Sequence, residues 1–189
     1  MSATPQAARV RTPHAALFSF MLTTFALLAA ACGGDGDDKP PKGYVLETIL
    51  DSTRPGYEIA RREDWSAQKG AKSGADVFDL FSAPEKVGNF TPNVNVYCDR
   101  SGAKSGTDNY TQTAVSELAK EKITAKVEKK VPIAGAQASL VTFSEDFDFA
   151  QIYATDINCA WVLTLTTPEG KRDDYMETFL QMAKTFKRY

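Results

Sequence analysis

The chain has 189 residues and a single histidine, His14. The first 31 residues hold two of its 22 basic residues and none of its 24 acidic ones, so the rest of the chain has a net charge of 20 − 24 = −4. A mildly acidic chain lacks the basic face that nucleic acids require, and the lack of histidine beyond residue 31 excludes Ser-His-Asp catalysis, Cys-His catalysis and His-ligated metal sites there. We therefore expect a protein that is not an enzyme and that holds no metal or other cofactor.

Residues 17–32, LFSFMLTTFALLAAAC, are typical of an export signal that ends at a lipid attachment site. Arg9 and Arg11 precede an apolar stretch, and three alanines lead directly into Cys32. The AAAC ending resembles a bacterial lipobox, in which the cysteine is acylated on sulfur, although the usual Leu three residues before the cysteine is Ala29 here. We expect a lipoprotein signal peptide over residues 1–31 and palmitate at Cys32. An uncleaved membrane anchor stays open as an alternative, because residues 15–31 approach the roughly 20 residues that span a bilayer.

After Cys32 the composition changes to that of a solvated tether. The sequence GGDGDDKPPK over residues 33–42 is rich in Gly, Asp and Pro and poor in apolar residues. Residues 32–43 are therefore expected to be a lipidated cysteine and flexible linker, and residues 44–189 a single folded domain. The expected location is the cell envelope, on the extracytoplasmic side of a membrane, either in the outer leaflet or facing the periplasm.

The first half of this domain has the patterns of short strands. Residues 44–50 fit a strand or a short helix, residues 57–62 and 75–81 fit strands, and residues 68–74 fit a loop. In residues 91–100, TPNVNVYCDR, apolar and polar positions alternate with the period of a half-buried strand.

The second half predicts two helices with strands between them. A helix is expected from an N-cap at Asp108 to about Ile123, because Tyr110, Ala114 and Leu118 recur at helical spacing. Four strands are expected at residues 125–131, 136–143, 149–155 and 159–167, and a second amphipathic helix at residues 171–186. Consecutive strands with short turns form antiparallel sheets, so we expect an α+β fold with an antiparallel β-sheet flanked by two amphipathic helices.

The order of these elements resembles the Mog1/PsbP-like domains. The strand TPNVNVYCDR, the helix after it, the meander VPIAGAQASLVTF, the strand CAWVLTLTTPEG and a closing helix that ends in KTF carry the resemblance, which covers residues 44–186. Among such domains the chain is most similar to the bacterial LpqN and LpqT type lipoproteins, which join a lipobox to one domain of this kind. The resemblance implies an α/β/α sandwich with a binding or assembly role, and it supplies no active-site residues.

Cys98 and Cys159 form an even pair once Cys32 is assigned to the lipid. Cys98 shares its strand parity with Val94 and Val96, and Cys159 shares its parity with Trp161, so both side chains should face the same apolar side of the sheet. In an oxidising compartment the two cysteines can form a disulfide, and two buried thiols are the alternative.

Several aromatic residues lie in the loop-rich first half of the domain. They are Tyr57, Trp65, Phe78, Phe81 and Phe90. They are either core residues or the lining of a groove, for which we name Trp65, Phe78, Phe81 and Phe90 as candidates. The expected function is non-catalytic binding of an envelope lipid, a glycolipid or a protein partner. The alternative is an envelope hydrolase that uses paired carboxylates.

Overall fold

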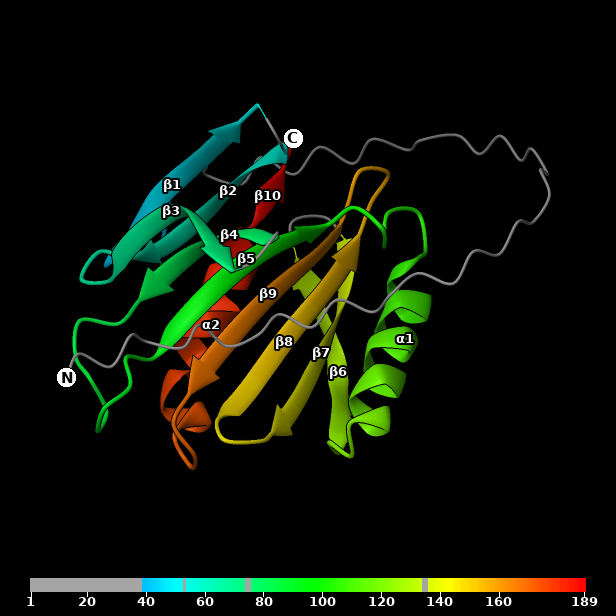
Figure 1. The fold of residues 1–189 in the computed structure, drawn as a ribbon. Coiled ribbons are helices and arrows are strands. Elements are labelled where there is room, and N and C mark those ends of the chain that lie inside the picture. Colours follow the sequence, from blue (N-terminus) through cyan, green and yellow to red (C-terminus); the bar gives the residue numbers. More distant parts are fainter. Residues whose placement is uncertain (1–38, 53, 74–75, 134–135) are drawn as a thin grey trace.

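The computed structural model describes residues 39–52, 54–73, 76–133 and 136–189, so the expected signal peptide and Cys32 lie outside the described residues. The described chain contains the following elements in order (Figure 1): β1 (Tyr44–Asp51), β2 (Arg54–Arg62), β3 (Ser66–Ser73), β4 (Asp76–Ser82), β5 (Asn93–Asp99), α1 (Thr107–Lys120), β6 (Ala125–Ile133), β7 (Ala136–Ser144), β8 (Asp148–Thr155), β9 (Ala160–Thr167), α2 (Arg172–Thr185) and β10 (Lys187–Arg188).

A seven-stranded antiparallel sheet is the centre of the fold. Its strand order is β3-β4-β5-β9-β8-β7-β6. The registers place Leu163 of β9 between Val96 of β5 and Ile152 of β8. These three positions are apolar because each strand turns the same parity toward one core. The α+β class and the large antiparallel sheet predicted from the sequence are confirmed.

A second sheet, which the sequence did not predict, has the order β1-β2-β10. The chain returns to β2 after α2, so that Lys187 lies opposite Glu58 and Arg188 opposite Tyr57. Ile49 and Tyr57 are opposite each other on the side that faces the core, and both are buried. This small sheet and α2 therefore cover one side of the large sheet together, whereas we had expected a helix alone to cover that side.

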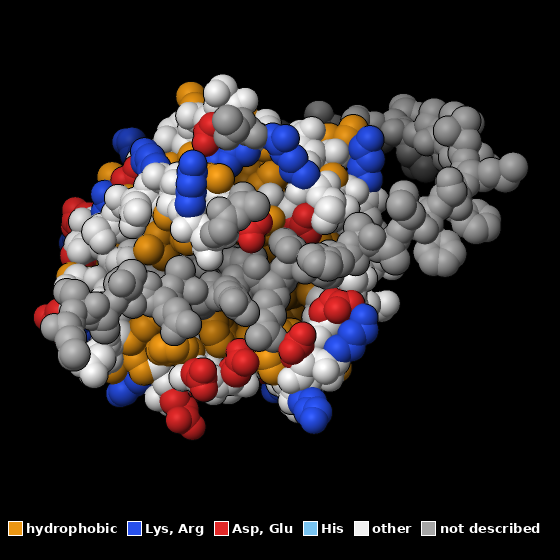
Figure 2. All heavy atoms as spheres, viewed as in Figure 1, with side chains coloured by type: hydrophobic (Ala, Val, Ile, Leu, Met, Phe, Trp, Pro, Cys, Tyr) orange, Lys and Arg blue, Asp and Glu red, His pale blue; other side chains and the backbone are white. Residues whose placement is uncertain are grey.

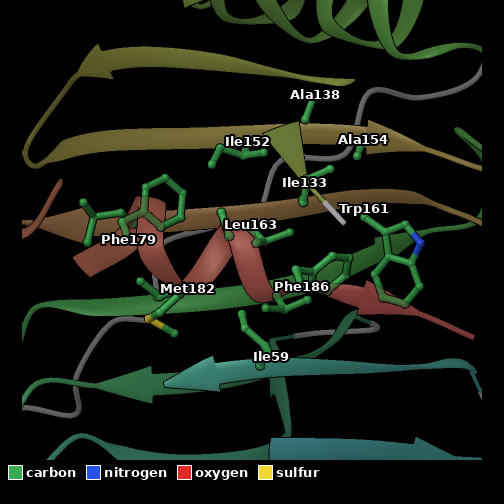
Figure 3. Packing of buried hydrophobic residues seen from close by; sticks show 14 of the residues in the cluster. Ile59, Ile133, Ala138, Ile152, Ala154, Trp161, Leu163, Phe179, Met182 and Phe186 are labelled. Carbon is green, nitrogen blue, oxygen red and sulfur yellow. The ribbon is translucent and has the colours of Figure 1, made fainter. Parts of the chain in front are cut away.

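The main core lies between the large sheet, α2 and the small sheet (Figure 3). Phe179, Met182 and Phe186 come from α2 and the residue after it, and all three are fully buried. The ring of Phe186 packs against Trp161 of β9 at 5.3 Å and against Tyr57 of β2 at 5.1 Å. Aromatic contacts at these distances stabilise a core beyond their buried area, so this cluster joins the two sheets and α2.

The other side of the large sheet carries α1. Tyr110 of α1 packs edge-on against Tyr153 of β8 at 5.6 Å, and its hydroxyl donates to Asp99 at the end of β5 at 2.9 Å. The helix begins at Thr107 after Gly106, whose φ of 81° is in the left-handed region. Asp108 lies inside the first turn and not at the N-cap, where we had expected it. The helix packs mainly on β6, β7 and β8.

A buried ion pair joins the small sheet to the large one. Asp79 of β4 is fully buried and accepts hydrogen bonds from Arg54 Nη2 at 2.7 Å, from the backbone N–H of Gly70 at 2.9 Å and from the Tyr57 hydroxyl. Burial raises the pKa of Tyr57 well above its ordinary value, and the negative charge of Asp79 adds to that rise. The phenol of Tyr57 therefore stays protonated and donates a hydrogen bond to the carboxylate of Asp79.

Candidate functional site

The four aromatic residues predicted to line a groove do not lie together. Phe81 is fully buried in the main core, and Trp65, which is 4 % exposed, packs there too. Phe78 is three residues before Phe81 on β4, so it faces the other side of the sheet, with Tyr97 and Val162. Phe90 packs against Phe147 at 4.5 Å, in the loops at the ends of the strands. A groove over all four would need Phe78 and Phe81 on one side of β4, which strand alternation forbids.

The pair Cys98 and Cys159 is a disulfide in this structure. The two Cα atoms are 5.4 Å apart, within the range that a disulfide requires. Cys159 is fully buried, and both cysteines belong to the main core. The side predicted from strand parity is therefore right. The bond ties the end of β5 to the start of β9, next to the loop between β8 and β9.

One small hollow lies beside Trp65. It has a volume of about 200 Å³ and is formed by the turn after β2, the loop after β4 and the first turns of α2. Trp65 contacts Tyr175 at 6.3 Å, and the rim carries Arg62, paired with Asp64 at 2.8 Å. Because Trp65 is almost completely covered and charged side chains form much of the rim, this hollow offers little apolar surface to a ligand.

Three buried carboxylates are the candidates for acid chemistry, and each is held separately. Asp79 binds Arg54 and Tyr57, Asp99 binds Tyr110 and Ser101, and Asp148 binds Ser144 and the backbone N–H of Gly170. Asp99 and Asp148 lie at opposite ends of the sheet, opposite Ala160 and Thr167 of β9. Within the described ranges, no group of three or more Cys, Asp or Glu residues is placed to hold a metal ion.

The broadest candidate surface is the side of the large sheet that carries α1. Because α1 packs mainly on β6, β7 and β8, the strands β9, β5 and β4 extend beyond the helix on this side (Figure 1). Figure 2 shows hydrophobic atoms at the surface of this side, above a row of acidic side chains. We call this region the open sheet face and define it by residues of β4, β5 and β9, namely Leu80, Asn95, Tyr97, Val162, Thr164 and Thr166. Leu80 is half-buried and the other five side chains are buried, so the name refers to the position of the region beyond α1 and not to its exposure.

A polar row crosses the centre of the open sheet face. Leu80, Asn95, Thr164 and Gln151 lie opposite one another on neighbouring strands. Gln151 Nε2 donates to Thr164 Oγ1 at 3.1 Å. The atoms Asn95 Oδ1 and Thr166 Oγ1 are buried and have no hydrogen-bond partner in the part of the chain that the structure describes. Buried polar atoms without a partner are costly, and they are often satisfied by a ligand or water.

Aromatic residues border the polar row. Phe78, Tyr97, Val162 and Tyr153 lie opposite one another in the next row of the sheet. Burial raises the pKa of both tyrosines, so their hydroxyls remain hydrogen-bond donors: Tyr97 donates to Asp76 at 3.1 Å and Tyr153 donates to Gln151. The face therefore combines an apolar border with a polar centre.

Sequence reasoning did not identify the open sheet face. Its polar residues, such as Asn95 and Thr164, occupy the positions of β5 and β9 that alternate with the main core, and such positions usually face water. The available signal was the run of Thr and Asn on two strands that become neighbours only in the folded chain.

Comparisons with known proteins bear on the fold. No family model and no curated protein matches the sequence. Among solved structures, LpqN of Mycobacterium tuberculosis, described as involved in cell envelope biogenesis, is 11 % identical with a TM-score of 0.52, covering 77 % of this chain and 91 % of LpqN. The cyanobacterial PsbP (CyanoP) of Synechocystis sp. PCC 6803 is 16 % identical with a TM-score of 0.49, covering 84 % of this chain and 98 % of CyanoP. The likeness to LpqN shows the fold alone, and it confirms the resemblance to PsbP-like and LpqN-like domains predicted from the sequence.

Neither of the helices in the described residues is long and apolar enough to cross a bilayer.

Proposed function

We propose that this protein is a lipid-anchored protein of the cell envelope that binds an envelope lipid or glycolipid on the open sheet face, without catalysis. The lipobox-like sequence that ends in Cys32 supports the anchor and the location. The likeness in fold to LpqN, a protein described as involved in cell envelope biogenesis, is consistent with this location. No catalytic role is proposed, because each buried carboxylate is already held by its own donors.

The polar row of the open sheet face carries the proposal. Asn95 Oδ1 in this row and Thr166 Oγ1, two residues along β9 from Thr164, are buried and call for hydrogen-bond partners that no described residue supplies. The neighbouring side chains Leu80, Tyr97 and Val162 are apolar or aromatic. A molecule with hydroxyl or amide groups next to acyl chains matches both parts of this surface, since binding sites commonly combine an apolar lining with a few polar groups.

Capture of lipids tests this proposal. The chain from residue 32 with Cys32→Ser is exposed to envelope lipid extract, and the bound molecules are identified by mass spectrometry. Thr166→Val and Asn95→Leu should each reduce capture several-fold. The matched control is Thr167→Val, because Thr167 is also buried with an unsatisfied hydroxyl but alternates to the other side of β9.

Two outcomes contradict the lipid-binding part of the proposal. One is that no lipid is enriched over an unrelated domain. The other is that Thr166→Val and Thr167→Val reduce capture equally, which indicates an effect on folding. Capture of a protein and no lipid favours a protein partner instead.

The anchor is tested separately. Cys32→Ser in the full chain should abolish incorporation of labelled palmitate and release the protein from the membrane, and unchanged labelling refutes the anchor.

A further inference from the structure

Exposed apolar side chains gather at one end of the molecule. Of the large hydrophobic residues in the described part of the chain, the three with the most exposed side chains are Leu50 (78 %), Ile157 (69 %) and Tyr189 (55 %). Leu50 lies at the end of β1, Tyr189 follows β10 and Ile157 lies in the loop between β8 and β9. Figure 1 places these three segments, together with the loop between β5 and α1, at the upper end. We call this region the basic end, for the charges described below.

Leu50 and Tyr189 both lie close to Gly56. The backbone N–H of Tyr189 donates to the carbonyl of Gly56 at 3.0 Å, which extends the pairing of β10 with β2. A Cβ atom at Gly56 would lie 3.0 Å from Leu50 Cδ2 and 3.6 Å from Tyr189 Cδ2. The two side chains therefore lie on either side of Gly56, on the outer face of the small sheet.

Further contacts hold the loop of Ile157 beside them. Arg188 Nη1 lies 3.5 Å from Asp156 Oδ2 and donates to the Thr155 carbonyl at 3.5 Å. The backbone N–H of Lys104 donates to the Asp156 carbonyl at 2.9 Å. These contacts join three loops and the C-terminal strand into one surface, so the apolar residues are held at fixed positions relative to one another.

The charge of this end is positive. Arg100, Lys104 and Lys187 are exposed here. Of its acidic residues, Asp156 lies beside Arg188 and Asp51 beside Arg54, which also pairs with Asp79. Asp99 and Asp76 accept hydrogen bonds from Tyr110 and Tyr97, and none of these acidic residues is exposed. Figure 2 shows several Lys and Arg side chains along the upper end, with a few acidic side chains among them, and a row of acidic side chains along the lower edge. The exposed charged residues named here are therefore cations, although the net charge beyond residue 31 is negative.

We propose that the basic end docks on the surface of an anionic lipid bilayer. Exposed cations are attracted to anionic headgroups, and apolar side chains at strand ends and loops enter the boundary between headgroups and acyl chains. Nucleic acid fits this surface less well, because only three exposed cations share it with three large apolar side chains. The inference extends the proposed lipid anchor at Cys32, but the docking surface exists without it.

The tether is long enough for this orientation. Eleven residues lie between Cys32 and Tyr44, so the twelve Cα–Cα steps (44 − 32) span at most about 40 Å when extended. β1 has eight residues, or roughly 26 Å, between Tyr44 at the far end and Asp51 at the basic end. An anchor at Cys32 therefore allows the basic end to reach the bilayer that holds the lipid.

Vesicle binding tests the proposal with the chain from residue 32 carrying Cys32→Ser. Phosphatidylcholine vesicles with and without 40 % phosphatidylglycerol serve as the probe. We expect binding only to the anionic vesicles, weakened by added salt. Lys104→Gln should weaken it about fivefold, from the roughly 1 kcal/mol that each cation near an anionic surface contributes. The control is Lys122→Gln, because Lys122 is also exposed and has a matching φ of 63° against 64° for Lys104, but it follows the C-terminus of α1 at the other end of the molecule.

A tethered form reports the orientation independently of natural lipidation. A His-tag in place of residues 32–38 holds the domain on vesicles that contain a nickel-chelating lipid, and a polarity-sensitive dye is attached to Ile157→Cys. We expect a blue shift of the dye on anionic vesicles and none for the dye at Val127→Cys, an exposed position on β6. Equal spectra at the two positions, equal binding to neutral vesicles, or equal loss in Lys104→Gln and Lys122→Gln overturns the proposal. Retention on heparin without vesicle binding also overturns it, in favour of a soluble polyanion. Since no step depends on acylation of Cys32 or on lipid capture by the open sheet face, failure here is distinct from failure of the proposed function.

Discussion

Replacement of Asp79 by alanine should be the most destabilising single change at the junction of the two sheets. The carboxylate is fully buried and accepts from Arg54, Tyr57 and the backbone of Gly70. Its removal leaves the guanidinium of Arg54, whose side chain is 7 % exposed, with Asp51 as its remaining carboxylate neighbour at 3.3 Å. It also leaves the hydroxyl of Tyr57 without its acceptor.

The size of the effect follows from these two losses. Breaking a buried ion pair by removal of one partner costs about 3–5 kcal/mol, and a buried hydroxyl without an acceptor costs about 1–3 kcal/mol. Because Asp51 still compensates part of the charge of Arg54, we expect the lower part of the combined range, about 4 kcal/mol. That is a large share of the roughly 5–15 kcal/mol by which a domain is stable.

Urea unfolding followed by tryptophan fluorescence measures the difference. The control is Asp64→Ala, which removes a carboxylate from the exposed pair with Arg62 and should cost about 0–1 kcal/mol. The double variant Arg54→Met with Asp79→Ala should recover part of the lost free energy, because no unpaired charge remains. The reasoning is refuted if Asp79→Ala costs no more than Asp64→Ala, or if adding Arg54→Met makes the protein still less stable.

Three further predictions concern the core. The intact mass of the protein should rise by two hydrogens on reduction of Cys98 and Cys159, and the reduced form should be about 4 kcal/mol less stable in urea, from the chain entropy of the closed loop; two thiols that alkylate without reductant contradict this. Gly102→Ala should cost about 1–3 kcal/mol in the same assay, since its Cβ would lie 2.6 Å from Ala160 Cβ and overlap the ring of Tyr110, whereas an unchanged midpoint would show that the loop yields. Burial raises the pKa of four tyrosines, so the folded state keeps phenol protons that the unfolded state loses: stability is complete below about pH 10 and falls as the pH rises beyond it. Absorbance at 295 nm should show that these tyrosines ionise together with unfolding, and a gradual ionisation before unfolding contradicts the assignment. The four residues are Tyr57, Tyr97, Tyr110 and Tyr153.

The sequence predicted the elements whose apolar pattern is strong. β5, β9 and α2 lie within one or two residues of the expected ranges, because each turns a continuous apolar side to one core. The side on which Cys98 and Cys159 lie followed from the same alternation. The α+β class then followed from the order of the strands and helices.

The elements that the sequence missed are held by contacts distant in the chain. Residues 68–74 were expected to be a loop, because they are rich in Gly, Lys and Ser. They form most of β3, whose first five residues are exposed and which forms by pairing with β4, with a bulge between Gln68 and Ala71. β10 has two residues, and it exists because α2 returns the chain to the edge of β2. No local pattern encodes such pairing.

The candidate surfaces were hidden for a related reason. The aromatic groove was inferred from the number of rings in the first half, but Phe81 and Trp65 are needed to fill the core between β4, the small sheet and α2. The open sheet face depends on which strands become neighbours, and the basic end depends on which loops meet. Both are products of strand order, which the sequence did not specify beyond the expectation of one antiparallel sheet.

The two proposed surfaces are connected by the direction of the strands. β5 runs toward the basic end and β9 runs away from it, so the polar row of Asn95 and Thr164 crosses strands whose ends lie beside the loops of Lys104 and Ile157 (Figure 1). With the basic end on a bilayer, these strands rise from the membrane, and the open sheet face extends upward from the lipid surface. A lipid that leaves the bilayer would then meet the ring of Tyr97 before it reaches the unsatisfied acceptor of Asn95, because Tyr97 is the nearer of the two to the end of β5. Docking and binding thus require the same orientation, so Lys104→Gln should reduce the transfer of lipid from vesicles to the protein while leaving capture from detergent solution unchanged. Equal loss in both assays would contradict this connection, because Lys104 would then act on capture itself and not through docking on the bilayer.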